Sequence, residues 1–118
     1  MSTSAGRRVD KPWGHEEVWA EGPGYVGKLL IIRAGHRLSL QHHAQKVETI
    51  RVLSGELEIS VGDHPERLQT ERAGPGAVIH IPAGLLHRMR AITDLELVEV
   101  STPELDDVVR HADDYGRS

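Results

Sequence analysis

Apolar residues in this chain occur in short runs that are separated by turns rich in glycine and proline. Such turns lie at 21–24, 34–35, 54–55, 74–76 and 82–84. Between Glu56 and Val61, apolar and polar residues alternate, which is the period of a strand with one buried face. Strands are therefore predicted where β-branched and apolar residues concentrate, at 26–33, 46–53, 56–61, 77–81 and 95–100.

The spacing of these short strands predicts an all-β fold, either a sandwich or a barrel. The segments 46–53 and 56–61 flank Ser54-Gly55 and predict a β-hairpin at that turn. The C-terminal end differs, because Pro103 is followed by the segment 104–110, in which acidic residues precede apolar ones. We therefore expect an all-β chain with one short C-terminal helix.

Composition excludes several classes of function. The chain of 118 residues is long enough for one domain with a buried core. Its 14 Lys and Arg residues against 18 Asp and Glu residues argue against a surface for nucleic acid or anionic membrane. No apolar run could span a membrane and the first residues lack a secretory signal, so we expect a cytoplasmic protein. With eight histidines and no cysteine, any metal site must use nitrogen and oxygen ligands.

The densest group of polar residues comprises Gln41, His42 and His43, and Glu48 follows shortly after. Side chains on a strand alternate between its faces, so Gln41 and His43 share one face and His42 points to the other. Glu48 reaches the same face if the polar stretch 44–46 turns the chain back. Burying an amide, an imidazole and a carboxylate without a partner is costly, and a bound cation is one way to compensate. From this segment alone, a solvent-exposed polar turn is the alternative.

A second segment, from Gly76 to His87, contains an apolar run, a Pro-Gly turn and then a histidine. It fits the pattern G-x5-P-x-G-x2-H. The segment from Gly35 to Gly55 fits the pattern G-x5-H-x-H-x4-E-x6-G, with Gln41 in place of the first histidine. Because both patterns occur in order, the chain resembles the cupin superfamily. That resemblance implies a jelly-roll barrel, or double-stranded β-helix, with one divalent metal ion inside its mouth.

The combination of glutamine, histidine, glutamate and histidine makes the chain similar to the C-terminal cupin domain of type II mannose-6-phosphate isomerases. Other family-like stretches lie at 11–14, 38–41, 81–88, 99–100, 106–110 and 114–117. The resemblance implies that one divalent metal ion per chain is held by Gln41, His43, Glu48 and His87. Such ligands suit Zn, Mn, Fe, Co or Ni. We expect a cupin domain at 11–118 that is preceded by a flexible tail at 1–10.

In that family the cupin domain usually follows a mannose-1-phosphate guanylyltransferase, so this sequence is expected to be a stand-alone isomerase-like domain. The resemblance implies aldose–ketose isomerisation of a sugar phosphate or a related small sugar. However, Thr49-Ile50 replaces the family's His-Trp after Glu48, and the stretch 44–46 is shorter and less basic. These changes affect the pocket wall more than the ligand set. Two other functions therefore stay open: oxygenation or C–C cleavage of a small metabolite, and non-catalytic sugar binding.

Two further residues are candidates for catalysis. His80 could transfer a proton near neutral pH, and the alternative is a wall residue bonded to backbone or solvent. Arg88 is by resemblance a candidate for binding phosphate, and the alternative is a surface ion pair. Other phosphate candidates are Lys28, Arg33 and Arg37. The resemblance also implies a homodimer formed through sheet edges.

Overall fold

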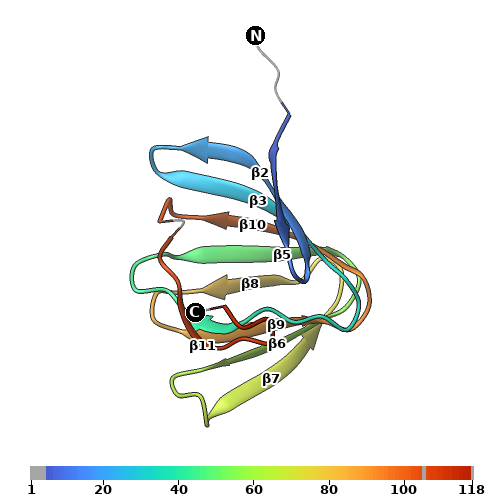
Figure 1. Ribbon diagram of the computed structural model, residues 1–118, viewed down its shortest axis with the longest axis vertical. Coiled ribbons are helices and arrows are strands. Elements are labelled where there is room, and N and C mark those ends of the chain that lie inside the picture. Colours follow the sequence, from blue (N-terminus) through green and yellow to red (C-terminus); the bar gives the residue numbers. More distant parts are fainter. Residues whose placement is uncertain (1–4, 105, 118) are drawn as a thin grey trace.

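The structure, a computed structural model, describes residues 5–104 and 106–117. In these residues the strands form two sheets (Figure 1). The six-stranded sheet contains, in spatial order, β1 (Arg7–Lys11), β2 (Gly14–Gly22), β3 (Tyr25–Ile32), β10 (Leu95–Ser101), β5 (Glu48–Ser54) and β8 (Val78–Ile81). The five-stranded sheet contains β11 (Val109–Ala112), β4 (Leu40–His42), β9 (Leu86–Ala91), β6 (Leu57–Gly62) and β7 (Leu68–Ala73).

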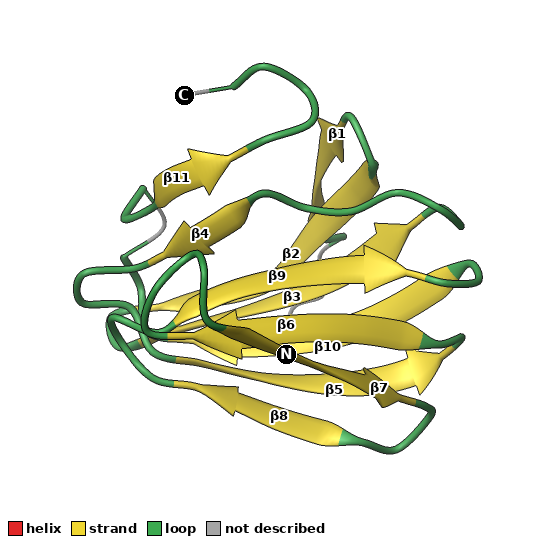
Figure 2. Cartoon of the chain, turned by 90° about the horizontal axis from the view of Figure 1, so that it is seen from below, coloured by secondary structure: helices red, strands yellow, loops and turns green. Residues whose placement is uncertain are grey.

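The two sheets pack face to face around one apolar core (Figure 2). Alternation along each strand decides which side chains enter this core. Leu57 and Ile59 of β6 are buried in it, and Leu95 and Leu97 of β10 are buried from the opposite sheet. Burying apolar side chains from both sheets stabilises the fold by about 25 cal/mol for each Å² of apolar area removed from water. This two-sheet, all-β architecture confirms the predicted fold class.

Strand pairing brings the predicted metal ligands to one end of the sandwich. β4 pairs with β9 so that Gln41 lies opposite His87. His43 directly follows β4, and Glu48 is the first residue of β5 in the other sheet. The connection 44–47 therefore crosses from one sheet to the other and carries a candidate ligand at each end.

The hairpin predicted around Ser54-Gly55 is wrong. β5 pairs with β10 and β8, whereas β6 pairs with β7 and β9, so the two strands belong to different sheets. Gly55 has a φ of 85°, and a Cβ atom placed there would lie 2.1 Å from the carbonyl oxygen of Asp94. The turn is thus a tight corner between sheets. Alternating apolar residues face the core in either arrangement, so the pattern could not distinguish a hairpin from a corner.

The predicted C-terminal helix is also wrong within the described residues, which contain no helix. Val109–Ala112 instead forms β11, which pairs with the edge of β4. The carboxylate of Asp107, expected in the first turn of a helix, accepts hydrogen bonds from the connection 44–46 instead. Leu105, which the predicted helix included, lies outside the described residues. The described part of the chain also holds no helix that could cross a membrane.

The first sheet begins before the expected start of the cupin domain at residue 11. β1 pairs with β2 along its whole length, from Arg7 opposite Val18 to Lys11 opposite Gly14. The described part of the expected tail at 1–10 thus contributes an edge strand. Residues 1–4 of that expected tail lie outside the described residues.

Candidate metal centre

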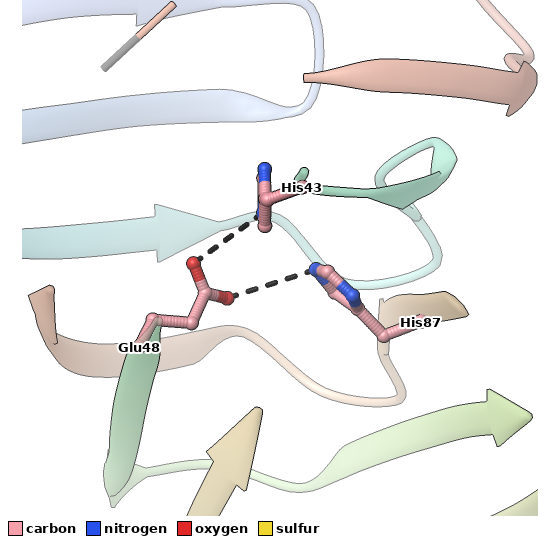
Figure 3. A group of neighbouring side chains, drawn as sticks. All are labelled: His43, Glu48 and His87. Carbon is pink, nitrogen blue, oxygen red and sulfur yellow. Dashed lines mark ion pairs between the residues drawn. The ribbon is translucent and has the colours of Figure 1, made fainter. Parts of the chain in front are cut away.

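Three buried side chains converge at the end of the sandwich, as Figure 3 shows. His43 Nε2 lies 3.6 Å from Glu48 Oε2, and His87 Nε2 lies 3.7 Å from Glu48 Oε1. The side chains of His43, Glu48 and His87 are 5%, 2% and 1% exposed. Their potential ligand atoms all lie within 4.8 Å of one another. The glutamate thus presents one oxygen to each imidazole ring.

Hydrogen bonds on the far side of each ring fix its tautomer. His43 Nδ1 donates to the backbone carbonyl of Asp107, and His87 Nδ1 donates to that of Leu85 at 2.9 Å. A carbonyl oxygen can only accept, so in each neutral ring Nδ1 carries the hydrogen and Nε2 presents a lone pair. Burial lowers the pKa of both imidazoles, which favours this neutral form. Both rings are therefore oriented as metal ligands usually are.

The potential metal-binding atoms of these side chains face one another, and no hydrogen atom lies between them. Among the described residues, His43 Nε2 and His87 Nε2 are buried without a hydrogen-bond partner, and each faces an oxygen of the Glu48 carboxylate. Burying polar atoms without partners costs free energy, and the lone pair of each imidazole nitrogen repels the carboxylate oxygen that it faces. A cation bound by all three would remove both costs. Ligand atoms at about 2.1 Å from a tetrahedral metal lie roughly 3.4 Å apart, close to the two distances observed here. The residues present therefore fit a divalent metal ion.

Gln41, the predicted fourth ligand, lies beside this group. It is opposite His87 across the β4–β9 pair, and it lines the same cavity as His43 and Glu48. Its Oε1 accepts a hydrogen bond from Ser39 Oγ at 2.7 Å. An amide oxygen has two lone pairs, so this bond leaves one available. The assignment of Gln41 as a ligand stays a prediction.

A buried lysine and a second buried glutamate extend the site. Lys46 Nζ lies 3.1 Å from Glu48 Oε2 and 3.5 Å from Glu99 Oε2. Burial opposes the charged form of Lys46, but attraction to Glu99 and Glu48 outweighs it and raises the pKa of Lys46. Burial and repulsion from Glu48 raise the pKa of Glu99 to about 7. A carboxyl group with such a pKa can either take up or release a proton at neutral pH.

These groups line a cavity of about 270 Å³ that also carries several cationic side chains. A cavity near the lower end of the usual range of roughly 300–1,000 Å³ suits a small metabolite. Within it, Lys28 Nζ pairs with Glu16 Oε1 at 3.3 Å, and both side chains are largely buried. The other cationic residues that line the cavity are Arg7, Lys11, Lys46, Arg110 and Arg117.

The two predicted catalytic residues take other positions. His80 lies opposite Thr49 in the β5–β8 pair, is exposed, and its Nδ1 is hydrogen-bonded to Thr49 Oγ1 at 2.9 Å. Glu48 points inward at the start of β5, so alternation places Thr49 and its neighbour His80 on the outer face. This geometry removes the basis for a proton shuttle at His80.

Arg88 likewise serves the fold in this structure. Its Nε donates to the Leu38 carbonyl at 2.9 Å and its terminal nitrogen to the Ala112 carbonyl at 3.4 Å. It also lies 3.6 Å from a carboxylate oxygen of Asp114. Because Arg88 follows the inward-facing His87 on β9, alternation turns it away from the ligands and toward the C-terminal segment.

Asp107 joins this C-terminal segment to the metal-centre connection. Its carboxylate oxygens accept hydrogen bonds from the backbone N–H groups of Ala44, Gln45 and Lys46 at 2.9, 2.7 and 3.0 Å. Hydrogen bonds from Gln45, then Ala44 and Lys46, hold the pKa of Asp107 at about 2. The carboxylate is therefore ionised at neutral pH.

Comparison with known proteins places this geometry in a family. Residues 2–113 match the family described as "Mannose-6-phosphate isomerase C-terminal". The chain belongs to this mannose-6-phosphate isomerase C-terminal family. It is 33% identical over 117 residues to the xanthan biosynthesis protein XanB of Xanthomonas campestris, covering 95% of this chain and 24% of that protein. It is 33% identical over 116 residues to the mannose-1-phosphate guanylyltransferase ManC of Salmonella typhimurium, covering 94% of this chain and 23% of that protein.

This family member thus spans about a quarter of the length of the curated relatives it matches. Solved structures agree on its fold. KdgF from a Halomonas species has a TM-score of 0.75 at 18% identity, covering 86% of this chain and 91% of that chain. Oxalate decarboxylase from Bacillus subtilis has a TM-score of 0.78 at 15% identity, and the match covers 90% of this chain and 30% of that chain. These similarities confirm the cupin fold that the two sequence patterns predicted.

Three residues of the site in this family member were missed by sequence reasoning. Lys46 lies two positions before Glu48, so strand alternation already placed both on one face. Glu99 continues the inward series of Leu95 and Leu97, which was a usable signal for a buried carboxylate. Asp107 gave no such signal, because its contacts with 44–46 depend entirely on how the C-terminal segment packs.

Proposed function

We propose that this protein is a metal-dependent aldose–ketose isomerase that acts on a sugar phosphate or a related small sugar. The observation that carries the proposal is the pair of unpartnered imidazole nitrogens on His43 and His87 that face the Glu48 carboxylate, beside a cavity with a buried lysine and a second buried carboxylate. Membership of the mannose-6-phosphate isomerase C-terminal family supports this choice of reaction. Gln41, His43, Glu48 and His87 would hold the metal, with Zn, Mn, Fe, Co and Ni as candidates.

The reaction moves a proton between two neighbouring carbons of an open-chain sugar. A bound divalent metal supplies electrostatic stabilisation of negative charge that develops on the sugar oxygens. Glu99, with a pKa of about 7, takes the proton from carbon 2 and returns a proton to carbon 1. Lys46, which contacts Glu99 at 3.5 Å, stabilises the ionised carboxylate before it accepts the proton. His80 has no part in this scheme, because it faces outward.

An anionic substrate is favoured by the charges of the cavity. Arg7, Lys11, Arg110 and Arg117 line it together with Lys28, which is already paired with Glu16. Guanidinium groups bind phosphate oxygens well, since they offer parallel N–H donors. Arg7 pairs with Glu21 and Arg117 with Asp113, but both still line the cavity. Arg33, Arg37 and Arg88, the other phosphate candidates of the sequence, do not line it: Arg33 binds the Pro12 carbonyl, Arg37 binds Asp114 and Arg88 binds backbone carbonyls. We therefore place the phosphate at the Arg and Lys side chains of the cavity.

The test is to incubate the protein with fructose 6-phosphate in deuterated water, loaded in turn with each candidate metal. Isomerisation should give mannose 6-phosphate that carries deuterium at carbon 2. Glu99→Gln should lower kcat by 100-fold or more, in the range for loss of a general acid–base, while the metal content stays near wild type. His64→Ala, a substitution at an exposed histidine, is the matched control and should keep full activity.

Two outcomes would overturn the isomerase. Metal-dependent oxygen consumption without isomerisation would favour the oxygenase reading of the same centre. Saturable binding of a sugar phosphate by the metal-loaded protein, with neither reaction in any metal form, would favour a binding module. Cytoplasmic location and a homodimer stay predictions, which fractionation and light scattering of the full chain would check.

A further inference from the structure

Asp107 contacts the connection between two candidate metal ligands through both its side chain and its backbone. The carboxylate accepts the N–H groups of Ala44, Gln45 and Lys46, and the backbone carbonyl accepts the Nδ1 hydrogen of His43. One residue thus fixes the tautomer of a candidate ligand and the path of the chain that leaves it. None of these contacts involves the ligand atoms themselves.

The remaining N–H group of the connection is held by the same C-terminal segment. Val47 N donates to Thr102 Oγ1 at 3.0 Å, and Thr102 N donates to the Val47 carbonyl at 3.0 Å. Every backbone N–H from residue 44 to residue 47 therefore has an acceptor in the segment 102–107. The connection 44–47 runs from His43, directly after β4, to Glu48 at the start of β5. Its path therefore sets the separation of those two side chains.

We propose that Asp107 is a positioning residue that holds His43 and Glu48 at metal-binding separation before any metal binds. The inference rests on the metal centre of the proposed function and adds a determinant of its affinity. Without the three N–H contacts, the connection could adopt other paths and the two ligands would lose their fixed separation. Ordering them would then lower the affinity for metal, because part of the binding free energy would be used to restore the connection.

The same contacts link the metal centre to the wall of the cavity. Beyond Asp107, the C-terminal segment supplies Val108, Arg110 and Arg117 to the cavity lining and pairs with β4 through β11. If the C-terminal segment fixes the positions of His43 and Glu48, then metal bound to these residues must also reduce the mobility of that segment, because coupling between two sites is reciprocal. Metal binding should therefore slow hydrogen exchange at the amides of Ala44, Gln45 and Lys46 in the wild type.

The first experiment measures metal affinity of the full chain and of the variants Asp107→Asn and Asp107→Ala. Competition with a chromophoric chelator would give the dissociation constants for Zn²⁺ and Co²⁺. We expect Asp107→Ala to weaken binding by about 10–100-fold, the range seen when groups that orient metal ligands are removed. Asp107→Asn keeps one side-chain acceptor, so its dissociation constant for metal should lie between those of the wild type and Asp107→Ala.

The matched control is Asp114→Asn. Asp114 lies in the same segment and binds Arg37 in a bidentate pair, away from the connection 44–47. If loosening the segment in general were enough, both substitutions would weaken metal binding equally. The proposal expects less than a threefold change for Asp114→Asn. Equal effects of the two substitutions would overturn it.

A second measurement needs no metal and covers the case in which a variant is poorly folded. The ¹⁵N shifts of the His43 ring in the metal-free protein report which nitrogen carries the hydrogen. The wild type should show the Nδ1–H tautomer, whereas Asp107→Ala should show a mixture, since its carbonyl is no longer held in place. An unchanged tautomer together with unchanged affinity would overturn the proposal. Wild-type protein that shows the Nδ1–H tautomer yet binds no metal would instead overturn the proposed function.

Discussion

The Nε2 atom of His87 and the Oε1 atom of Glu48 lie 3.7 Å apart, and both are acceptors. The single ring hydrogen of His87 is used on the Leu85 carbonyl, so no hydrogen remains to join the pair. His43 has the same relationship with the other oxygen of Glu48. Lys46 Nζ pairs with Glu48 Oε2, but the two imidazole nitrogens have no partner, so a metal cation bound among the three side chains should stabilise the folded protein.

Divalent metal should stabilise the wild type and not the variant His87→Ala. A ligand that binds the folded state alone, at a free concentration of 100 times its dissociation constant, raises the free energy of unfolding by about 2.7 kcal/mol. Thermal unfolding with Zn²⁺ or Mn²⁺, and after dialysis against a chelator, would measure this difference. Elemental analysis should show metal in the wild type and a marked loss in His87→Ala and Gln41→Ala. Equal metal in all three proteins would contradict the assigned ligands.

The ligand spacing and the strand pattern could be predicted from sequence because both are local properties. Gln41, His43 and Glu48 lie within one short segment, and strand alternation placed the first two on one face. What could not be predicted depends on long-range packing. Nothing near Ser54-Gly55 reveals that β5 and β6 enter different sheets, and nothing near Asp107 reveals that its carboxylate binds the connection 44–46. The outward position of His80 followed from its pairing with Thr49, which required the strand register.

Removing the imidazole of His80 should leave isomerase activity and metal content close to wild type. His80 is exposed on the outer face of the six-stranded sheet, and its hydrogen bond joins Thr49 rather than any group of the cavity. We expect His80→Ala to change kcat/KM less than threefold, in contrast with Glu99→Gln. The two variants should be compared under the same metal and pH conditions. A large loss of kcat in His80→Ala, with unchanged stability, would return this histidine to the mechanism.

Breaking the buried contact between Lys46 and Glu99 should destabilise the fold strongly. Both side chains are less than 10% exposed, and removing one partner of a buried pair typically costs about 3–5 kcal/mol. Lys46→Met should therefore lower the free energy of unfolding by an amount in that range. The double variant Lys46→Met with Glu99→Gln should be less destabilised than the sum of the single variants, because it leaves no unpaired charge at Glu99. Urea unfolding of all four proteins completes the cycle, and strict additivity would refute the coupling.

Acid should weaken the local structure of the C-terminal segment, in which Asp113 binds Arg117. Side-chain hydrogen bonds from Arg117, helped by its backbone N–H, hold the pKa of Asp113 at about 2. A free aspartate has a pKa of about 3.9, so the folded value is depressed. The stabilising contribution is therefore complete above about pH 4 and is lost as the pH falls toward 2. The stability difference between the wild type and Asp113→Asn should shrink over this interval in urea unfolding.

The control for that pH dependence is Asp63→Asn. Asp63 forms an exposed ion pair with Arg67, with 82% of its side chain accessible. Such a pair contributes little to stability, so the difference between wild type and Asp63→Asn should stay small at every pH. A wild-type advantage over Asp113→Asn that is the same at pH 5 and pH 2.5 would refute the role assigned to the Asp113 carboxylate.

The corner at Gly55 should tolerate alanine far less well than the turn at Gly76. Both residues have a positive φ, 85° at Gly55 and 90° at Gly76, so alanine should cost about 1–2 kcal/mol of backbone strain at either position. A Cβ atom at Gly76 has no neighbour within 4 Å, whereas one at Gly55 would lie 2.1 Å from the Asp94 carbonyl oxygen. The difference in unfolding free energy between the two variants therefore isolates the close approach of the two chain segments.

Because Gly55 joins the two sheets, relieving this clash must shift β5 against β10. We expect Gly55→Ala to be the more destabilised variant and also to bind metal more weakly, since Glu48 is on β5. Equal destabilisation of the two variants would show that strain alone explains the glycine.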